Sequence, residues 1–81
     1  MVFIYVLSSR VRNYIYVGLT NNTERRLKEH QDGRNKTTKP YRPFKLVWVE
    51  EFKIRDEARK REKYLKSGVG KEWIKEKILK K

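Results

Sequence analysis

Five residues of this 81-residue chain carry side chains that could together form a site for an anion and a divalent cation. Tyr5 and Tyr16 are phenols in short apolar segments. Arg26 and His30 are four residues apart, so on a helix they share one face and place a cation beside a titratable ring. Glu62 is a carboxylate on the apolar side of a second predicted helix. If these side chains converge, they form a site for an anion and a divalent cation.

Each of these residues also has an ordinary structural explanation, and spacing alone does not choose between the two. The tyrosines could be sheet residues whose hydroxyls reach the rim of the core. His30 could be an exposed or capping residue near the end of its helix. Glu62 falls between Ala58 and Leu65 on one helix face, where an ionised group is costly unless it is paired. Its ordinary partners are the basic residues about one turn away, Arg59, Lys63 and Lys66.

The elements that must position these residues follow the order ββαβαα. Apolar runs rich in β-branched and aromatic residues predict three strands, the first two forming a hairpin. Helix formers, a capping position and glycine stops predict three helices. We therefore expect one domain over residues 1–81, of the α/β (α+β) class, with a small three-stranded, mostly antiparallel sheet flanked by three helices. The predicted strands are 2–7, 14–19 and 44–52, and the predicted helices are 23–31, 56–66 and 70–81.

The register of the hairpin decides whether the two tyrosines meet. A symmetric turn centred on Arg10-Val11 pairs residues whose numbers add to 21, so Tyr5 would face Tyr16. A slip of one residue would move one ring to the other face of the sheet.

The composition restricts the chemistry. The chain has no Cys and only one His, which excludes disulfides, cysteine proteases and zinc hydrolases with several histidines. Lys and Arg outnumber Asp and Glu by 22 to 10, and a formal charge of +12 favours a polyanionic partner. The longest apolar run, Val2–Leu7, is far shorter than the ~20 residues of a membrane span. With no secretory signal in the pattern, we expect a cytoplasmic protein that contacts no membrane.

Residues 33–43 contain two prolines and no acid, so they predict an exposed basic loop. Its cations are spaced along the chain and interleaved with aromatic rings, a pattern that suits phosphate contacts with base stacking. A loop that merely keeps the protein soluble is the alternative. The predicted nucleic-acid-binding residues are Arg34, Lys36, Lys39, Tyr41, Arg42 and Lys45, with Phe44 beside them.

Four short motifs together resemble the GIY-YIG nuclease superfamily. Phe3–Tyr5 and Tyr16–Gly18 are similar to its two name-giving motifs, with eleven positions from one tyrosine to the other. The segment Arg26–His30 resembles its Arg-x3-His helix, and Ala58–Lys66 resembles the helix with its metal-binding glutamate. The resemblance spans nearly the whole chain. The chain resembles the family's small single-domain bacterial members and the N-terminal catalytic domain of the nucleotide excision repair nuclease subunit.

The resemblance implies hydrolysis of DNA phosphodiester bonds with one divalent ion, Mg²⁺ or Mn²⁺, held by Glu62. It implies an endonuclease directed by DNA structure more than by sequence, as in repair or recombination. Arg26 would bind the scissile phosphate, and Tyr16 would orient water or phosphate. Either Tyr5 or His30 would be the general base, and the sequence does not choose between them.

The chain departs from the family pattern at three points. Phe3 stands where the first motif has Gly, and Val17 stands where the second has Ile. No Asn follows Asn35, whereas some members carry one near the end of the domain. A non-catalytic module that binds DNA or RNA on the same fold is therefore the main alternative, and a subunit that works only inside a larger complex is a third. The expected partner is DNA, structured or single-stranded, with RNA less favoured.

Overall fold

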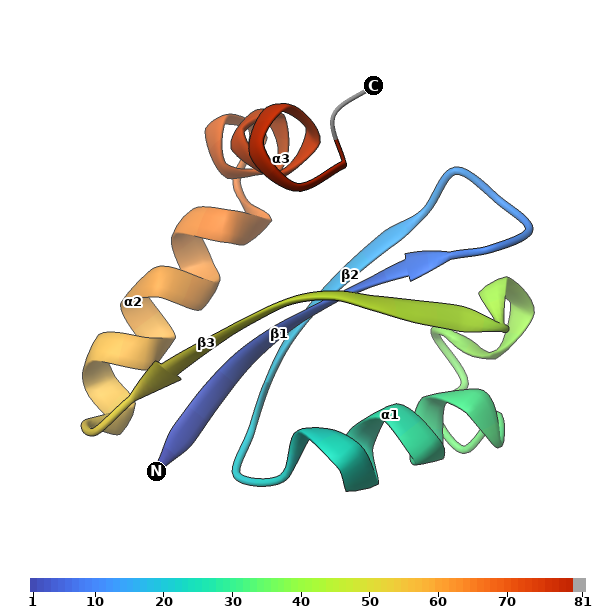
Figure 1. The fold of residues 1–81 in the computed structure, drawn as a ribbon, viewed down its shortest axis with the longest axis horizontal. Helices are drawn as coiled ribbons and strands as arrows, with labels where there is room; N and C mark the ends of the chain where they lie inside the picture. Colours follow the sequence, from blue (N-terminus) through green and yellow to red (C-terminus); the bar gives the residue numbers. More distant parts are fainter. Residues whose placement is uncertain (80–81) are drawn as a thin grey trace.

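The computed structural model describes residues 1–79 and has the predicted order of elements (Figure 1). The α+β class with three strands and three helices is confirmed. The part of the predicted helix 70–81 beyond residue 79 lies outside the described residues. The elements are β1 (Val2–Ser9), β2 (Ile15–Thr20), α1 (Thr23–Gln31), β3 (Phe44–Phe52), α2 (Arg55–Lys66) and α3 (Gly68–Ile74), with short helical turns η1 (Lys39–Tyr41) and η2 (Lys75–Leu79).

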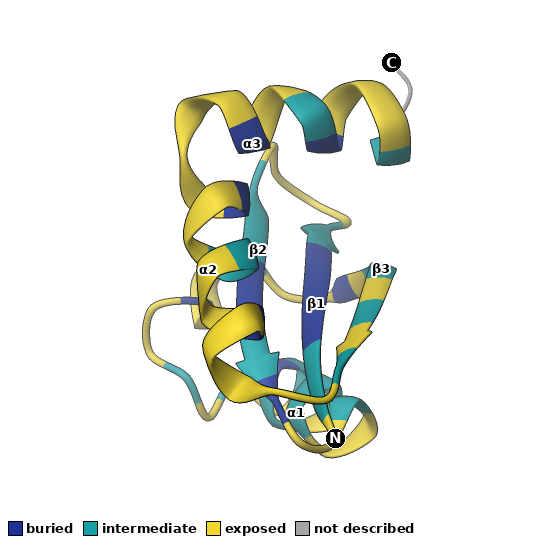
Figure 2. Cartoon of the chain, turned by 90° about the vertical axis from the view of Figure 1, so that its left-hand side faces the viewer, coloured by how far each residue is buried: buried dark blue, intermediate teal, exposed yellow. Residues whose placement is uncertain are grey.

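The three strands form one antiparallel sheet in the order β2-β1-β3. Helix α1 lies on one face, and α2 and α3 lie on the other (Figure 1). Alternate residues of β1 therefore enter two separate sets of buried side chains. Ile4 and Val6 pack with Ala58 and Leu65 of α2, whereas Tyr5 faces the α1 side. The central strand is the most continuously buried part of the chain (Figure 2).

The predicted register of the β1-β2 hairpin is wrong by two residues. Paired residues add to 23, so Tyr5 lies opposite Gly18 and Leu7 lies opposite Tyr16. The turn reaches one residue further than a symmetric turn at Arg10-Val11, because the Ser9 hydroxyl accepts hydrogen bonds from the backbone N–H groups of residues 11 and 12. A shift of two residues keeps both tyrosines on one face. Their rings are diagonal neighbours, with centroids 6.1 Å apart.

Helix α1 begins and ends where the sequence predicts, and two polar contacts fix it. Asn22 caps its first turn, since Oδ1 accepts from the backbone N–H of Arg25 at 3.0 Å. At its other end, the side-chain amide of Gln31 accepts from the backbone N–H of Phe44 at 2.7 Å and donates to its carbonyl at 2.8 Å. These two bonds tie α1 to the start of β3.

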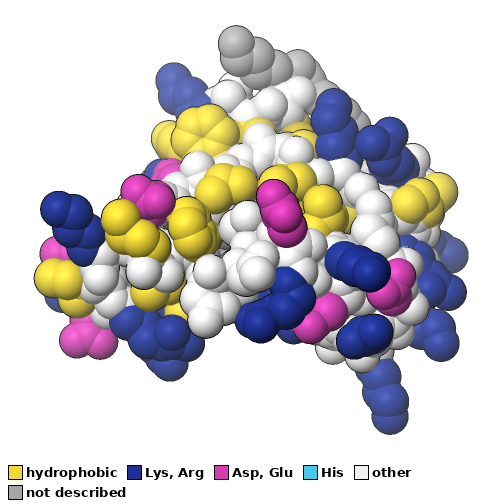
Figure 3. Space-filling view, turned by 60° about the horizontal axis from the view of Figure 1, so that its bottom comes forward, with side chains coloured by type: hydrophobic (Ala, Val, Ile, Leu, Met, Phe, Trp, Pro, Cys, Tyr) yellow, Lys and Arg dark blue, Asp and Glu magenta, His cyan; other side chains and the backbone are white. Residues whose placement is uncertain are grey.

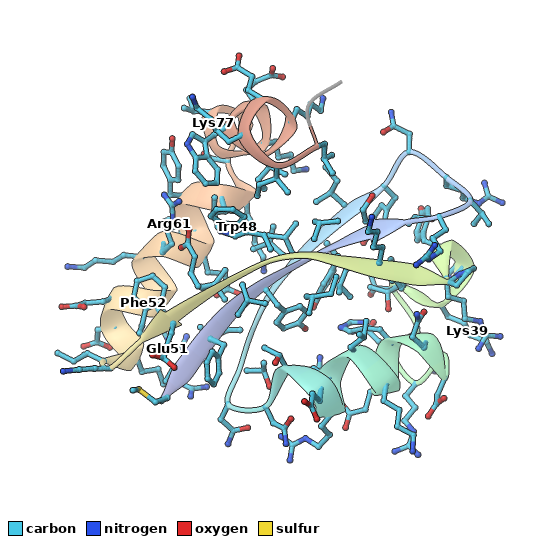
Figure 4. All side chains as sticks on the ribbon, viewed as in Figure 1. Lys39, Trp48, Glu51, Phe52, Arg61 and Lys77 are labelled. Carbon is cyan, nitrogen blue, oxygen red and sulfur yellow. The ribbon has the colours of Figure 1, made fainter. Side chains whose placement is uncertain are left out.

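Helices α2 and α3 are fastened to β3 by one cation among aromatic rings (Figure 4). Arg61 donates to both carboxylate oxygens of Glu50, at 2.8 and 2.9 Å. Its guanidinium carbon lies 4.7 Å from the centre of the Trp73 ring, and Trp48 donates to the same carboxylate at 2.9 Å. A bidentate, partly buried pair of this kind is strong and geometrically specific. Among residues 1–79, no helix is long and apolar enough to cross a membrane.

Candidate active site

Four of the five predicted site residues meet between α1 and the sheet. Tyr5 lies at the middle of β1, Tyr16 lies on β2, and Arg26 and His30 project from α1. The Tyr5 hydroxyl lies 3.0 Å from His30 Nε2. The His30 ring lies 4.8 Å from the Tyr16 ring, centroid to centroid. The order of the elements thus brings together residues that are up to 25 positions apart in the chain.

His30 is completely buried, and both of its ring nitrogens have partners. Nε2 meets the Tyr5 hydroxyl, and Nδ1 lies 2.8 Å from the hydroxyl of Thr38. The rings of Tyr5, Tyr16 and Phe44 surround the imidazole. The lone histidine is therefore neither exposed nor a helix-capping residue. A buried histidine with two satisfied nitrogens is a natural relay for a proton.

Gly18 makes room for the Tyr5 phenol. A Cβ atom at this position would collide with the hydroxyl and ring of Tyr5 on the neighbouring strand. The ring can therefore lie flat over the β2 backbone and reach His30. This contact gives a physical reason for the glycine of the second motif.

Arg26 stands at the more open side of the cluster. Its side chain is 31% exposed, and Nη1 donates to Glu29 Oε1 at 2.7 Å. The neighbouring Tyr5 hydroxyl and the Glu29 carboxylate raise the pKa of Arg26. A guanidinium placed between a carboxylate and a phenol could exchange the carboxylate for a phosphate.

Burial shifts the pKa of two groups in the cluster. Desolvation raises the pKa of Tyr5 to about 12, and the neighbouring Arg26 opposes only part of this effect. Desolvation also lowers the pKa of His30 below 6.5, helped by Arg26 and opposed by Glu29. At neutral pH, Tyr5 is therefore a neutral phenol and His30 a neutral imidazole. A neutral imidazole can accept a proton from the phenol, whereas an imidazolium cannot.

Glu62 lies on α2, against the other face of the sheet. Arg61 and Glu62 are adjacent, so they flank the buried stripe of Ala58 and Leu65 on opposite sides. Because Arg61 binds Glu50 of β3, Glu62 lies on the side of α2 toward the edge strand β2. Among the residues that the structure describes, no hydrogen bond or ion pair joins Glu62 to the cluster around His30.

The donor set at Glu62 fits an ion that is held mostly by water and phosphate oxygens. Its side chain is 22% exposed, and one carboxylate oxygen lies 3.2 Å from Lys66 Nζ, the ordinary ion pair that the sequence also allows. Residues 1–79 contain no group of three or more Asp, Glu or His side chains able to hold a metal. Mg²⁺ keeps several waters and often binds proteins through one or two carboxylates. Glu62 could thus take part in a metal site that substrate completes.

The predicted basic loop exposes its cations, whereas its aromatic residues are covered in part or in full. Phe44 is only 2% exposed and packs against His30. Tyr41 stacks on Tyr14, with ring centroids 3.8 Å apart, so one of its faces is covered. The exposed residues of the predicted set are the cations Arg34, Lys36, Lys39, Arg42 and Lys45. These cations suit contacts with backbone phosphates.

The tip of the β1-β2 hairpin extends this basic surface. Ser9 donates to the Tyr41 carbonyl at 2.6 Å, and the backbone N–H of Arg10 donates to the Pro43 carbonyl at 2.9 Å. These bonds hold Arg10 and Arg12, both exposed, beside the loop. Figure 1 places the hairpin tip and η1 at the same end of the molecule, and Lys and Arg side chains gather at that end in Figure 3. We call this end, formed by the exposed cations of residues 10–12 and 34–45, the basic end.

Four residues that contribute to the site were not predicted from the sequence. Thr38 binds His30, Gln31 anchors α1, and Arg10 and Arg12 join the basic end. No spacing signal could identify Thr38 or Gln31, because their partners are set by tertiary contacts. The basic residues between the two predicted strands were a usable signal for the hairpin tip.

The chain matches the family model of the GIY-YIG catalytic domain over residues 1–77, and it therefore belongs to the GIY-YIG family. Similar proteins include a UPF0213 protein of Bacillus licheniformis, 45% identical over 65 residues that make up 79% of this chain and 66% of that protein. A UPF0213 protein of Clostridium perfringens is 40% identical over 82% of this chain and 71% of its own length. The UPF0213 protein YazA of Bacillus subtilis is 38% identical over 79% of this chain and 65% of its own length.

The chain thus spans about two thirds of the length of these relatives. Their names state no substrate or activity. No solved structure matches the chain. The family assignment indicates a nuclease-type fold.

Proposed function

We propose that the protein is a divalent-metal-dependent endonuclease that hydrolyses DNA phosphodiester bonds, directed by DNA structure more than by sequence. The observation that carries the proposal is the 3.0 Å contact between the Tyr5 hydroxyl and the buried His30 Nε2, beside the guanidinium of Arg26. A phenol linked to a neutral imidazole and next to a cation is a system that can remove a proton from water. DNA repair and recombination supply the irregular substrates that such an enzyme would cut.

The burial of the residues orders their roles. His30 is fully buried and Tyr5 is 2% exposed, whereas Tyr16 is half-buried and Arg26 is partly exposed. His30 therefore does not meet the attacking water directly. Tyr5 stands between them and takes the proton of the water as its own proton passes to His30 Nε2. This order favours Tyr5 as the general base and His30 as the acceptor behind it.

The reaction balances with these groups. The oxygen of the water bonds to phosphorus, and the bond from phosphorus to the leaving oxygen breaks. The leaving oxygen takes a proton from solvent, and His30 returns its proton to solvent after the product has left. Arg26 exchanges Glu29 for the scissile phosphate and stabilises the charge that develops there. Removing one such preorganised donor typically costs ~10²- to 10³-fold in rate.

Glu62 would hold the divalent ion, with water and phosphate oxygens as the other ligands. When bound, the ion neutralises charge on the phosphate and on the leaving oxygen. Glu62 lies on the β2 side of α2, and Tyr16 lies on the α1 face of that same edge strand, so a phosphate between them would have to reach around the β2 edge of the sheet. The ion pair with Lys66 would open to release the second carboxylate oxygen.

A second candidate is a DNA- or RNA-binding module without catalysis. The pairing of the charged site residues favours it, since Arg26 is bound to Glu29 and Glu62 to Lys66. The same basic end would bind nucleic acid in either case.

Nicking of supercoiled plasmid separates the two candidates. The wild type is expected to nick with Mg²⁺ or Mn²⁺ and to stop in EDTA. Glu62→Gln and Arg26→Ala should lose at least about 10²-fold in rate while still binding DNA. Arg26→Lys should be nearly as damaging as Arg26→Ala, because an ammonium lacks the planar fork.

The matched controls are neighbours on the same helices. Glu57→Gln changes an exposed carboxylate of α2, and Arg25→Ala removes an exposed guanidinium of α1, so both should keep full activity. A wild type that binds plasmid, single strands, flaps and RNA hairpins but cuts none of them would establish the binding module instead.

A further inference from the structure

Thr38 is an exception in the basic loop, because it is completely buried while its neighbours Thr37 and Lys39 are exposed. Its hydroxyl lies 2.8 Å from His30 Nδ1 and 3.4 Å from the backbone carbonyl of Asn35. Within residues 1–79, no buried side-chain nitrogen or oxygen lacks a hydrogen-bond partner. The side chains of Tyr5, His30 and Thr38 therefore form one hydrogen-bonded network, in which the donor of each group must point to an acceptor of the next.

The direction of the network follows from its Thr38 end. A carbonyl oxygen can only accept, so the single proton of the Thr38 hydroxyl points to Asn35, and the hydroxyl oxygen accepts from His30 Nδ1. A neutral imidazole carries one proton, so Nε2 then has a free lone pair and accepts from the Tyr5 hydroxyl at 3.0 Å. The contacts of Thr38 thus select the tautomer with the proton on Nδ1.

We propose that Thr38 is a positioning residue that holds His30 in the Nδ1–H tautomer, so that Nε2 is free to receive the proton of Tyr5. This inference rests on the proposed function, in which that proton transfer activates water. Thr38 itself touches no reacting atom. With the opposite tautomer, Nε2 would carry a proton and point it at Tyr5, and the phenol would have no acceptor.

The position of Thr38 gives this role a second consequence. It lies between Lys36 and Lys39, two exposed cations of the basic end. The segment that contacts phosphates is thus the same segment that sets the tautomer of His30. A displacement of the loop would weaken the bond to Nδ1 and release the constraint.

The tautomer can be measured directly by ¹⁵N NMR of the imidazole, at a pH where His30 is neutral and without any substrate. Wild-type protein is expected to show a protonated Nδ1 and a pyridine-like Nε2. Thr38→Ser keeps the hydroxyl and should keep this pattern. Thr38→Val keeps the shape but removes the acceptor, and should move the proton wholly or partly to Nε2. The control Thr37→Val changes an exposed neighbour and should leave the spectrum unchanged.

The value of kcat should change in the same Thr38 variants in which the tautomer changes. Loss of an orienting hydrogen bond behind a catalytic group typically costs ~10- to 100-fold. We expect Thr38→Val to lower kcat by this factor with KM unchanged. Thr38→Ser should retain most of the wild-type kcat. A loss of kcat caused only by misfolding of Thr38→Val would also change the backbone NMR spectrum of that variant.

Two outcomes would overturn the inference. A wild-type spectrum with the proton on Nε2 contradicts it without any variant, even if Thr38→Val does not fold. An unchanged tautomer in folded Thr38→Val contradicts it as well. If the wild-type enzyme cuts DNA while either result is found, only the role of Thr38 is lost. If the tautomer is as expected but the wild type cuts nothing, the proposed function fails and removes the catalytic part of the inference.

Discussion

The position and the protonation state of the Tyr5 side chain depend on three neighbouring residues. Its ring lies over Gly18, its hydroxyl meets His30, and Arg26 stands at its open side. Burial keeps the phenol neutral, with a pKa raised to about 12. The phenol can therefore act as a base only if it passes its own proton to an acceptor, and the neutral imidazole of His30 is that acceptor.

The lowered pKa of His30 makes stability depend on pH. In the unfolded chain the imidazole binds a proton near pH 6.5, whereas in the folded chain it does so only at lower pH. As pH falls below 6.5, the unfolded state binds the proton first, so the free energy of unfolding decreases until the folded pKa is passed. Thermal unfolding between about pH 7.5 and 5 should show this loss. His30→Gln should flatten the curve in this range, and an unchanged slope would contradict a buried neutral imidazole.

Substitution of Gly18 tests the placement of the Tyr5 ring. Gly18→Ala adds a methyl group where the phenol lies, so the ring must move away from His30. Because a misplacement of about 1 Å can cost ~10²-fold, we expect a loss of that order in nicking rate. Gly68→Ala is the matched control, since a Cβ there meets no atom within 4 Å. Equal activity of the two variants would show that the phenol does not need this position.

At the scale of elements, the sequence predicted what local signals determine. The bounds of α1 and β3 were correct, because a capping residue, a following glycine and alternating apolar residues mark them. The hairpin register was wrong, because it depends on how Ser9 caps the turn. Of the five residues considered as one site, Tyr5, Tyr16, Arg26 and His30 lie together, whereas Glu62 lies on the other face of the sheet. The position of α2 relative to them depends on tertiary packing, and the sequence could not supply it.

The hairpin tip gives a prediction that belongs to an element. Arg10→Gln combined with Arg12→Gln should weaken binding to duplex DNA in EDTA, measured by fluorescence anisotropy. The slope of log affinity against log salt should become shallower by about 0.9 for each phosphate that is no longer neutralised, or about 2 for the pair. Lys60→Gln with Lys63→Gln removes the same charge from the exposed face of α2 and should change the slope little. Equal slopes for both pairs would mean that only net charge matters.

At the scale of the whole molecule, the basic end and the candidate chemistry have separate places. The basic end lies at one end of the sheet, and Lys39 marks it, whereas Arg61 and its aromatic neighbours lie at the other end (Figure 4). The cluster around His30 lies between the sheet and α1. A nucleic acid that follows the basic end would pass the open side of this cluster at Arg26. Binding and cleavage can therefore be changed by different substitutions.

The sheet also divides the buried side chains into two sets that share only the backbone of its strands. The set around Ile4 and Leu65 has its polar contacts, those of Arg61 with Glu50, in partly buried positions, whereas the set around Tyr5 encloses the buried polar network of His30. Substitutions that lie more than about 7–10 Å apart and share no partners usually have additive effects on stability. Mutations that improve packing beneath α2 could therefore offset destabilising changes beside α1. Substitutions beside α1 could then change the candidate site while packing beneath α2 maintains the stability of the fold.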